Sequence, residues 1–422
     1  MRSLLTLAWA SAWHRRLALS LVVLSLALST FLLLTIERVR HDVRENFSNA
    51  VSGTDLIVGA RGGAVPLLLY SVFRIGQPTQ TIEYRSALAL QTDSAVRWVV
   101  PISLGDTHRG FPVVATTTAF FEHFRYGPRR ELELREGRRF QAVFDAVLGA
   151  EVAQQLGYRL GESLVLQHGS GELHHDEHDE MPFTVVGILA RTGTPVDRSV
   201  HIPLEGMEAL HVDWAAGMPL PGAPRTTAES AQTMDLTPRS VSAALVGLKT
   251  RSAVFAFQRR VQAYEGEPLM AVLPGVALDE LWGTVAQAER AMTLMSALVG
   301  AVSLAGLMAV VMTALEQRRR ELAVLRSVGA GPRRVFTLLL IEGLFISALG
   351  VAAGACAWWL ALWVGGPLVQ SEYGITLSSG APRLNEATLA TAVLVAGVLA
   401  SLWPGWRAYR LSLADGLTPR GA

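Results

Sequence analysis

Long apolar runs, separated by charged or mixed stretches, dominate the hydrophobic pattern of this chain of 422 residues. A helix of about twenty apolar residues is long enough to cross the hydrocarbon core of a membrane. Runs of this kind occupy residues 17–36, 291–315, 335–364 and 387–406. The pattern therefore predicts an α-helical membrane protein with four transmembrane helices, the first near the amino terminus and the others in the last third of the chain.

The first apolar run follows a short basic segment, residues 1–16, and a secretory signal peptide begins in the same way. The run at residues 17–36 is longer than the apolar part of a typical signal peptide. The sequence Glu37-Arg38-Val39-Arg40 also stands where a cleavage site of small residues would be needed. We therefore expect a retained first helix, with residues 1–16 in the cytoplasm.

Residues 37–288 have a mixed composition, in which alternating stretches predict strands and stretches of helical period predict helices. Strands are predicted at 54–58, 98–102, 112–116, 163–167, 183–189, 199–202, 241–248 and 270–273, and helices at 67–73, 142–155, 204–210 and 252–264. The last helix and the strands on either side of it form a βαβ pattern. About 250 residues suffice for a separate core, so we expect a large α+β extracytoplasmic domain inserted between transmembrane helices 1 and 2.

The segment at residues 316–334, between the second and third apolar runs, is rich in arginine. Basic residues in short loops are retained on the cytoplasmic side, so this segment fixes the orientation of its neighbours. Both termini are then cytoplasmic, with an external loop at residues 365–386 and a cytoplasmic tail at residues 407–422. Leucines at helical spacing, followed by Gly329, predict a short amphipathic helix in the arginine-rich segment.

Composition narrows the possible functions. Half of the residues are hydrophobic and the mean hydropathy is +0.32, which favours the membrane class. Lys249 is the only lysine and lacks the spacing of a phosphate-binding loop, so we expect no ATP hydrolysis by this chain. Cys356 is the only cysteine, which excludes an intrachain disulfide and a cysteine metal site. We find no nucleophile-base or metalloprotease motif, and we expect neither an enzyme nor a nucleic-acid partner.

The sequence EQRRRELAVLRSVGA, from Glu316 to Ala330, resembles the coupling segment of MacB/FtsX/LolC-type ABC transporter permeases. The order of the spans and the closing PGWRAYR at residues 404–410 extend the resemblance over nearly the whole chain. The resemblance implies a membrane-proximal α/β subdomain at residues 40–115 and 240–280, and an inserted β-rich subdomain at residues 116–239. It also implies an ATPase contact formed by Glu316, Arg318, Arg319, Arg320, Glu321, Arg326, Gly329 and Ala330.

This resemblance implies that the chain is the membrane (permease) subunit of an ABC transporter complex. ATP and Mg²⁺ would be bound by a separate ABC ATPase, whose motion the permease, as a homodimer in the lipid, would transmit across the inner membrane. The extracytoplasmic domain would handle a substrate or bind an adaptor or substrate-carrier protein. The alternative is an FtsX-like regulatory membrane protein that switches an extracytoplasmic hydrolase or adaptor, and the residues leave both open.

The third apolar run contains two further candidates. Glu342 is an acid within an apolar helix, and such residues often have a function in membranes. It lies about two turns from the cytoplasmic end, so contact with interfacial water or Arg334 is the alternative. Gly350 and Gly354 have the spacing of small residues that lets membrane helices approach closely, and we expect a helix–helix contact there.

An extracytoplasmic loop contains a cluster of imidazoles and carboxylates, which are the ligands that zinc and similar divalent metals use. The alternative is a solvated acidic loop without a ligand. The candidate metal ligands are His174, His175, Asp176, His178 and Asp179.

Overall fold

The computed structural model describes residues 16–50, 53–168, 179–215, 218–219, 226–317, 332–373, 377–378 and 380–410. The chain divides into two compact units. The helical unit comprises the described parts of Met1–Asp42, Val285–Gln370 and Leu377–Ala422. The α/β unit comprises those of Val43–Thr284 and Ser371–Thr376.

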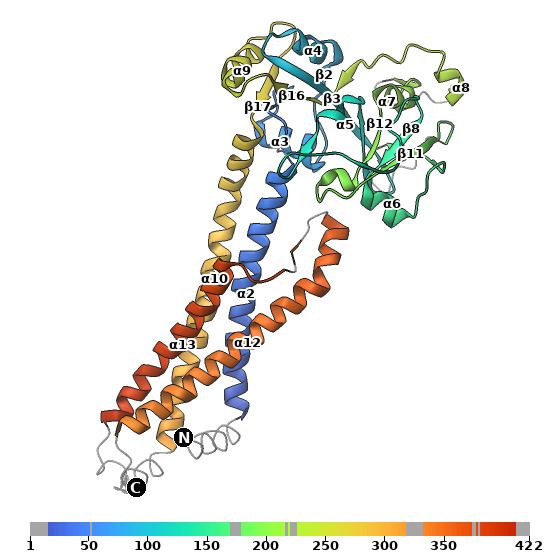
Figure 1. Cartoon of the computed structure of the whole chain (residues 1–422). Helices are drawn as coiled ribbons and strands as arrows, with labels where there is room; N and C mark the ends of the chain where they lie inside the picture. The colour runs from blue at the N-terminus through green and yellow to red at the C-terminus, as the bar shows by residue number, and fades with distance from the viewer. Residues whose placement is uncertain are drawn as a thin grey trace. The chain divides into compact units, whose positions relative to one another are not determined.

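The helical unit is built from long helices, each of which contains one of the predicted apolar runs. Figure 1 labels them α2 (Arg16–Ala50), α10 (Pro274–Gln317), α12 (Pro332–Tyr373) and α13 (Leu384–Arg410). Each is long and apolar enough to cross a membrane. At about 1.5 Å per residue the 44 residues of α10 span roughly 66 Å, about twice the hydrocarbon core. The ends of α2 and α10, residues 43–50 and 274–284, belong to the α/β unit.

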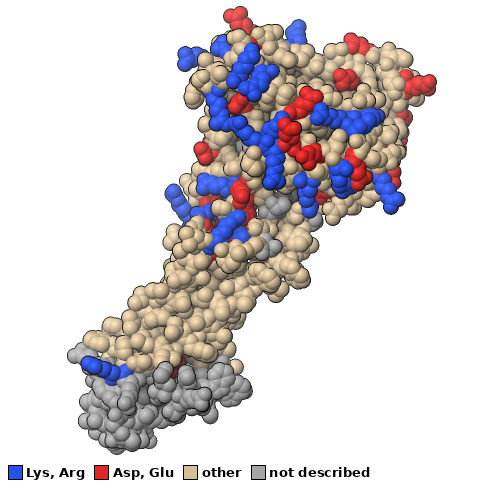
Figure 2. Space-filling view, in the orientation of Figure 1, with Lys and Arg blue, Asp and Glu red and all other residues tan. Residues whose placement is uncertain are grey.

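Apolar side chains hold the helices of the helical unit together. Leu26 of α2 packs with Leu307 of α10 and Ile346 of α12, and Leu34 of α2 packs with Trp358 of α12. The surfaces of the helices that face away from these contacts are also apolar. Figure 2 shows that the described spans carry almost no charged side chains on the visible face, as a surface in contact with lipid requires.

The α/β unit is organised around one sheet with the order β17-β1-β16-β3-β4-β12-β8-β11-β7. Two short strands, β9 and β10, pair with β11 and β3. The strands of this sheet are β1 (Leu56–Ala60), β3 (Val96–His108), β4 (Phe111–Thr116), β7 (Leu134–Gly137), β8 (Asp145–Leu148), β9 (Ser163–Leu164), β10 (Gln167–His168), β11 (Phe183–Leu189), β12 (Val200–Pro203), β16 (Ala243–Leu248) and β17 (Leu269–Val272).

Short helices and strand pairs complete this unit (Figure 1). The helices are α3 (Ala64–Leu68), α4 (Tyr84–Ala89), α5 (Ala119–His123), α6 (Ala150–Leu156), α7 (Leu204–Leu210), α8 (Ala228–Ala231) and α9 (Val254–Gln262), with tighter or wider turns η1 (Leu69–Phe73), η2 (Leu90–Thr92), η3 (Pro195–Arg198) and η4 (Arg251–Ala253). The strand pairs are β2 (Ile82–Glu83) with β15 (Ser240–Val241), β5 (Arg125–Tyr126) with β6 (Arg130–Glu131), and β13 (Trp214–Ala215) with β14 (Met218–Pro219).

Both faces of the sheet are buried. In β1, Val58 belongs to one apolar cluster and Ile57 to another, and in β4 the neighbours Val113 and Val114 divide in the same way. Because successive side chains of a strand point to opposite faces, the two clusters lie on the two faces. Each fully buried residue of this kind contributes about 1.5–3 kcal/mol. The apolar core therefore stabilises a unit in which no disulfide is possible.

The structure differs from the sequence prediction at several places. The strand predicted at residues 163–167 divides into β9 and β10, which pair with different strands. The helix predicted at residues 142–155 is wrong in its first half, since Asp145–Leu148 form β8 between β12 and β11, and only Ala150–Leu156 form a helix. A short apolar run fits either state, and here pairing with two neighbouring strands decides. The predicted βαβ unit is present in split form. β16 and β17 run parallel to each other, but β1 lies between them and is antiparallel to both.

Candidate functional site

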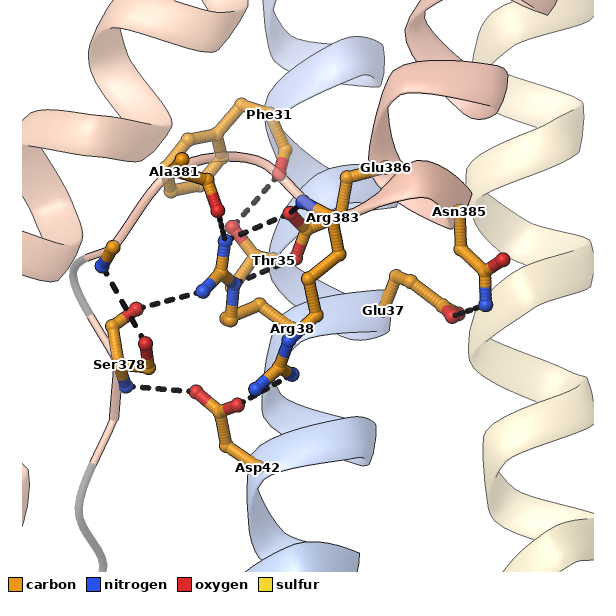
Figure 3. Close-up of polar contacts among 11 residues, drawn as sticks. Phe31, Thr35, Glu37, Arg38, Asp42, Ser378, Ala381, Arg383, Asn385 and Glu386 are labelled. Carbon is orange, nitrogen blue, oxygen red and sulfur yellow. Dashed lines mark hydrogen bonds and ion pairs between the residues drawn. The ribbon is translucent and has the colours of Figure 1, made fainter.

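A buried cluster of charged residues lies in the helical unit (Figure 3). Arg38 and Asp42 come from α2, Arg383 from the segment before α13, and Glu386 from the first turn of α13. The side chains of Arg38, Asp42 and Glu386 are at most 2% exposed, and that of Arg383 is 30% exposed. We call these four residues the charged joint. They comprise two acids and two bases, so their formal charges cancel.

Arg38 is held from several sides. Its Nη2 donates to Glu386 Oε2 at 2.7 Å, a charge-assisted hydrogen bond, and its Nε lies 2.6 Å from Glu386 Oε1 in the same ion pair. Its Nη1 donates to the carbonyl oxygen of Ser378 at 2.9 Å. Its guanidinium carbon lies 5.1 Å from the ring centre of Trp358 on α12. This one side chain therefore contacts α12, α13 and the segment between them.

Asp42 forms the second half of the charged joint. Its Oδ1 lies 2.7 Å from Nη1 of Arg383, and its Oδ2 accepts the backbone N–H of Ser378 at 2.8 Å. Arg38 and Asp42 are four residues apart on α2, which places them on the same helix face one turn from each other. The two ion pairs together hold this face of α2 to Arg383, just before α13, and to Glu386 in its first turn.

The start of α13 explains why Glu386 is in place for Arg38. The backbone N–H of Arg383 donates to Glu386 Oε2 at 2.7 Å. Arg383 precedes the first helical residue, so Glu386 occupies the third helical position and caps the helix from within. An acid in the first turn also interacts favourably with the helix dipole. The local sequence thus sets the helix start and the carboxylate that Arg38 contacts.

Glycines bring α12 close to its neighbours. A Cβ added to Gly354 would lie 2.5 Å from the carbonyl oxygen of Ala27, and one added to Gly350 would lie 2.7 Å from Cβ of Leu26. The predicted Gly350 and Gly354 therefore face α2. No side chain larger than hydrogen fits at Gly354 without moving α2.

The contact between α12 and α13 is reciprocal. A Cβ on Gly343 of α12 would lie 1.9 Å from Oγ of Ser401, and a Cβ on Gly397 of α13 would lie 2.1 Å from Oγ of Ser347. Each helix thus presents a glycine and a serine four residues apart, and each glycine receives the serine of the other helix. We infer that α12 cannot shift without moving α13 and α2.

The structure places only some of the other predicted site residues. Glu316 is exposed near the end of α10, and Glu342 is buried on α12, 7% exposed. The remaining predicted ATPase-contact residues, Arg318, Arg319, Arg320, Glu321, Arg326, Gly329 and Ala330, lie outside the described residues. The predicted coupling role of this segment therefore stays a prediction.

The predicted metal ligands fall almost entirely outside the described residues. Asp179 is described and lies in a turn, whereas His174, His175, Asp176 and His178 are not described. Among the described residues there is no group of three or more His, Cys, Asp or Glu that could hold a metal ion. Zinc binding by this loop stays a prediction.

Sequence reasoning missed the charged joint. Its signal was present, because Arg38 and Asp42 follow the first apolar run while Arg383 and Glu386 precede the last one. Each of these two spans thus carries one acid and one base at the same end. The acid of one span can then pair with the base of the other.

Two family profiles match this chain. Residues 17–264 match the MacB-like periplasmic core domain, and residues 293–413 match the FtsX-like permease C-terminal domain. The first match alone covers more than half of the 422 residues. The charged joint draws one pair of residues from each matched region.

Curated relatives include the pyoverdine export ATP-binding/permease protein PvdT from two strains of Pseudomonas fluorescens, Pf0-1 and Pf-5. Each is 30% identical over 137 residues, which is 32% of this chain and 20% of the relative. The matched part thus spans about a fifth of the length of these relatives.

Two solved structures are similar to parts of the chain. The periplasmic region of MacB from Actinobacillus actinomycetemcomitans has a TM-score of 0.33 and 10% identity, over 55% of this chain and 95% of that one. The extracellular domain of the noncanonic ABC-type transporter YknZ from Gram-positive bacteria has a TM-score of 0.28 and 12% identity, over 45% of this chain and 89% of that one.

Proposed function

We propose, from the premise that this chain belongs to the MacB/FtsX-like family of ABC transporter permeases, that it transmits ATP-driven motion from a separate ATPase to its own periplasmic domain. As a member of this family it is an inner-membrane permease, and its α/β unit is the periplasmic domain. The transmission of motion, the ATPase subunit and the outer partners are the proposed parts.

The observation that carries the proposal is the continuity of two helices. α2 and α10 each run without a break from residues of the helical unit to residues of the α/β unit. An unbroken helix transmits a tilt or a shift along its length, whereas a flexible linker would absorb it. The motion therefore has a path along α2 and α10 that requires no opening through the bilayer.

The charged joint and the glycine contacts extend this path to the other helices. The close approaches at Gly354 and Gly397 leave little room for α12 to slide against α2 or α13. Arg38 and Asp42 hold α2 to the segment that begins α13. A displacement of any one helix is then shared by the others, because a packed interface moves as a body rather than deforming continuously.

The input would come from the arginine-rich segment between α10 and α12. In this proposal Glu316, Arg320, Glu321, Arg326 and Gly329 contact the ATPase, which holds ATP and Mg²⁺. Two permease chains would accompany two ATPase chains. The name of the curated relative PvdT couples an ATP-binding part to a permease for export, which supports export as the direction of work here. The α/β unit would receive the substrate or an adaptor on the outer face.

Co-purification tests this proposal. The full chain, extracted in mild detergent from its own cells, should bring down an ABC ATPase whose activity the permease stimulates. Glu321→Arg and Arg326→Glu should each lower the stimulated activity at least about tenfold, because reversing one charge at a close pair replaces attraction by repulsion. Glu136→Arg, at a half-exposed position of β7, is the matched control and should have no effect.

Normal stimulation in both reversed variants would exclude the proposed contact segment. Recovery of no ATPase at all would exclude the transporter complex. An outer partner recovered in the same experiment distinguishes the family alternatives. A substrate-carrier protein supports transport, whereas a hydrolase whose activity follows ATP turnover supports the regulatory function.

A further inference from the structure

α9 places its core residues on one face and an aromatic side chain on another. Val254, Phe257 and Val261 are buried and pack in the apolar core of the α/β unit. Phe255 lies on the solvent side and is 69% exposed, the most of any large apolar residue that the structure describes in this unit. Burying a phenylalanine contributes about 1.5–3 kcal/mol, a stabilisation that the fold of this chain leaves unused.

Arginine side chains stand on both sides of this phenylalanine along the chain. Arg251 precedes Phe255 by four residues and Arg259 follows it by four, a spacing that places the three on one side of a helix. At about 1.5 Å per residue, the two arginines lie about 12 Å apart along the axis, with the ring between them. Both are exposed, and neither forms an ion pair with a residue that the structure describes. Their charges are therefore available to a partner.

Two further basic residues lie beside the start of this segment. Lys249 precedes Arg251 by two residues, and Nη2 of Arg97, on β3, donates to the carbonyl oxygen of Lys249 at 3.2 Å. Nζ of Lys249 donates to the carbonyl oxygen of Ser94 at 2.9 Å. Both side chains are exposed, and these carbonyl groups carry no formal charge. We call the following five residues the α9 patch: Arg97, Lys249, Arg251, Phe255 and Arg259.

Acids in the same region do not cancel the charge of the α9 patch. Asp93 accepts from Nε and Nη2 of Arg260 at 2.7 and 2.9 Å, so it is paired with an arginine outside the patch. Asp55 accepts the backbone N–H of Leu248 at 2.8 Å, and Glu265 follows the end of α9. Figure 2 shows Lys and Arg side chains gathered over the part of the unit where Figure 1 draws α9. The surface around the exposed ring is therefore positive.

The composition of the α9 patch fits a protein partner better than a lipid surface. Aromatic residues and arginine are enriched at the centres of protein interfaces and supply most of their binding energy. A helix that lies on a membrane buries a wide apolar face among the lipids. The apolar face of α9 is already used in the core of the unit, which leaves one ring for the outside.

We propose that the α9 patch binds a periplasmic partner protein through an apolar pocket that is rimmed by carboxylates. The ring of Phe255 enters the pocket, and Arg251 and Arg259 pair with Asp or Glu side chains on opposite sides of its rim, about 12 Å apart. Arg97 and Lys249 lie at the edge and speed the encounter by electrostatic attraction. This inference rests on the proposed function of the α/β unit at the outer face, for which it names the chemistry of the partner.

Photochemical cross-linking of the full chain in its own cells tests this surface. With p-benzoylphenylalanine in place of Phe255, light should attach one partner protein, which mass spectrometry identifies. The same group in place of Leu160, which is 41% exposed near the opposite edge of the sheet, should not attach that protein. The partner is then purified, and its affinity for the full chain in lipid nanodiscs is measured.

Phe255→Ala, Arg251→Glu and Arg259→Glu should each weaken the affinity for this partner at least about tenfold, as expected at the centre of an interface. Arg159→Glu is the matched control, because Arg159 is exposed and forms no ion pair with a described residue, and it should leave the affinity unchanged. Reversing the partner's rim carboxylates to lysine should restore binding to the two Arg→Glu variants. An attached protein supports the proposal only with this restoration.

Three results would overturn the proposal. They are the attachment of no protein at position 255, an affinity that neither Arg→Glu variant lowers, and binding of the patch to vesicles of phosphatidylglycerol and phosphatidylethanolamine in place of a protein. Stimulation of the ATPase, measured without the partner, should be normal in all three α9 variants. Loss of docking with normal stimulation therefore counts against this surface alone, whereas absent stimulation in the parent chain counts against the transmission of motion.

Discussion

Glu386→Gln tests the energetic weight of the charged joint. The substitution leaves the shape of the side chain but removes the charge that lies 2.6 Å from Nε of Arg38. Arg38 is 1% exposed, so water cannot replace the lost partner, and the carbonyl oxygen of Ser378 carries no formal charge. Removing one member of a buried ion pair costs about 3–5 kcal/mol. We expect the lower end, about 3 kcal/mol, because Trp358 and the carbonyl oxygen still face the guanidinium.

The free energy of unfolding can be measured for the full chain by circular dichroism in mixed micelles of a mild and a denaturing detergent. Arg40→Gln serves as the matched control, because Arg40 pairs with Glu37 on the same helix but is 45% exposed, and its loss should cost less than about 1 kcal/mol. The double variant Arg38→Met with Glu386→Met should recover most of the loss, since an apolar pair leaves no charge buried. If Glu386→Gln costs no more than the control, the joint does not hold α2 to α13.

Three further predictions concern packing, pH and metal. Gly354→Ala should destabilise the helical unit by about 1–3 kcal/mol, because its Cβ would meet a carbonyl oxygen at 2.5 Å. Gly306→Ala, whose Cβ would have nothing within 4 Å, should be neutral or stabilising. The same unfolding measurement can show both effects. Burial opposes a charge on the imidazole of His211, yet the carboxylate of Asp106, 3.6 Å away, raises its pKa. Their pair therefore stabilises the folded state fully below about pH 6.5 and loses this effect as pH rises through the folded pKa. The stability difference between the parent chain and His211→Gln should therefore shrink from mildly acidic to mildly alkaline pH, and a constant difference would exclude the pair. In calorimetry on the full chain, the heat of zinc binding should fall when His174, His175 and His178 are changed to Ala, and also when pH falls through about 6.5. Identical titration curves for the parent chain and the variant would remove the metal from the functional account.

Much of the fold follows from the sequence because its signals are local. Apolar runs predicted the regions of the helices that are long and apolar enough to cross a membrane, since crossing a bilayer demands length and apolarity from each helix alone. Alternation and helical period predicted β11 at residues 183–189 and α7 at residues 204–210 with the bounds that the structure has. The prediction at β8 failed because the conformation of this segment depends on the strands on either side of it, which come from distant parts of the chain.

The candidate sites also differ in whether a local sequence signal is enough to predict them. Gly350 and Gly354 could be selected from spacing alone, because small residues four apart create a groove on one helix whatever its partner is. The charged joint could not be selected from the sequence, since Arg38 and Glu386 are 348 residues apart and each alone is an ordinary charged residue beside an apolar run. Contacts between distant segments decide this site.

The central claim is that ATP turnover on the partner moves each permease chain as a body, so that the distance between the two α/β units of the proposed permease pair changes. Double electron–electron resonance measures this directly, with one spin label at the exposed Phe255 of α9 in each of the two chains, after Cys356 is replaced by Ser. In nanodiscs with the co-purified ATPase, trapping the ATP-bound state should shift the distance distribution, and Glu321→Arg should abolish the shift. Identical distributions with and without trapped ATP, while the ATPase hydrolyses ATP normally, would contradict the account.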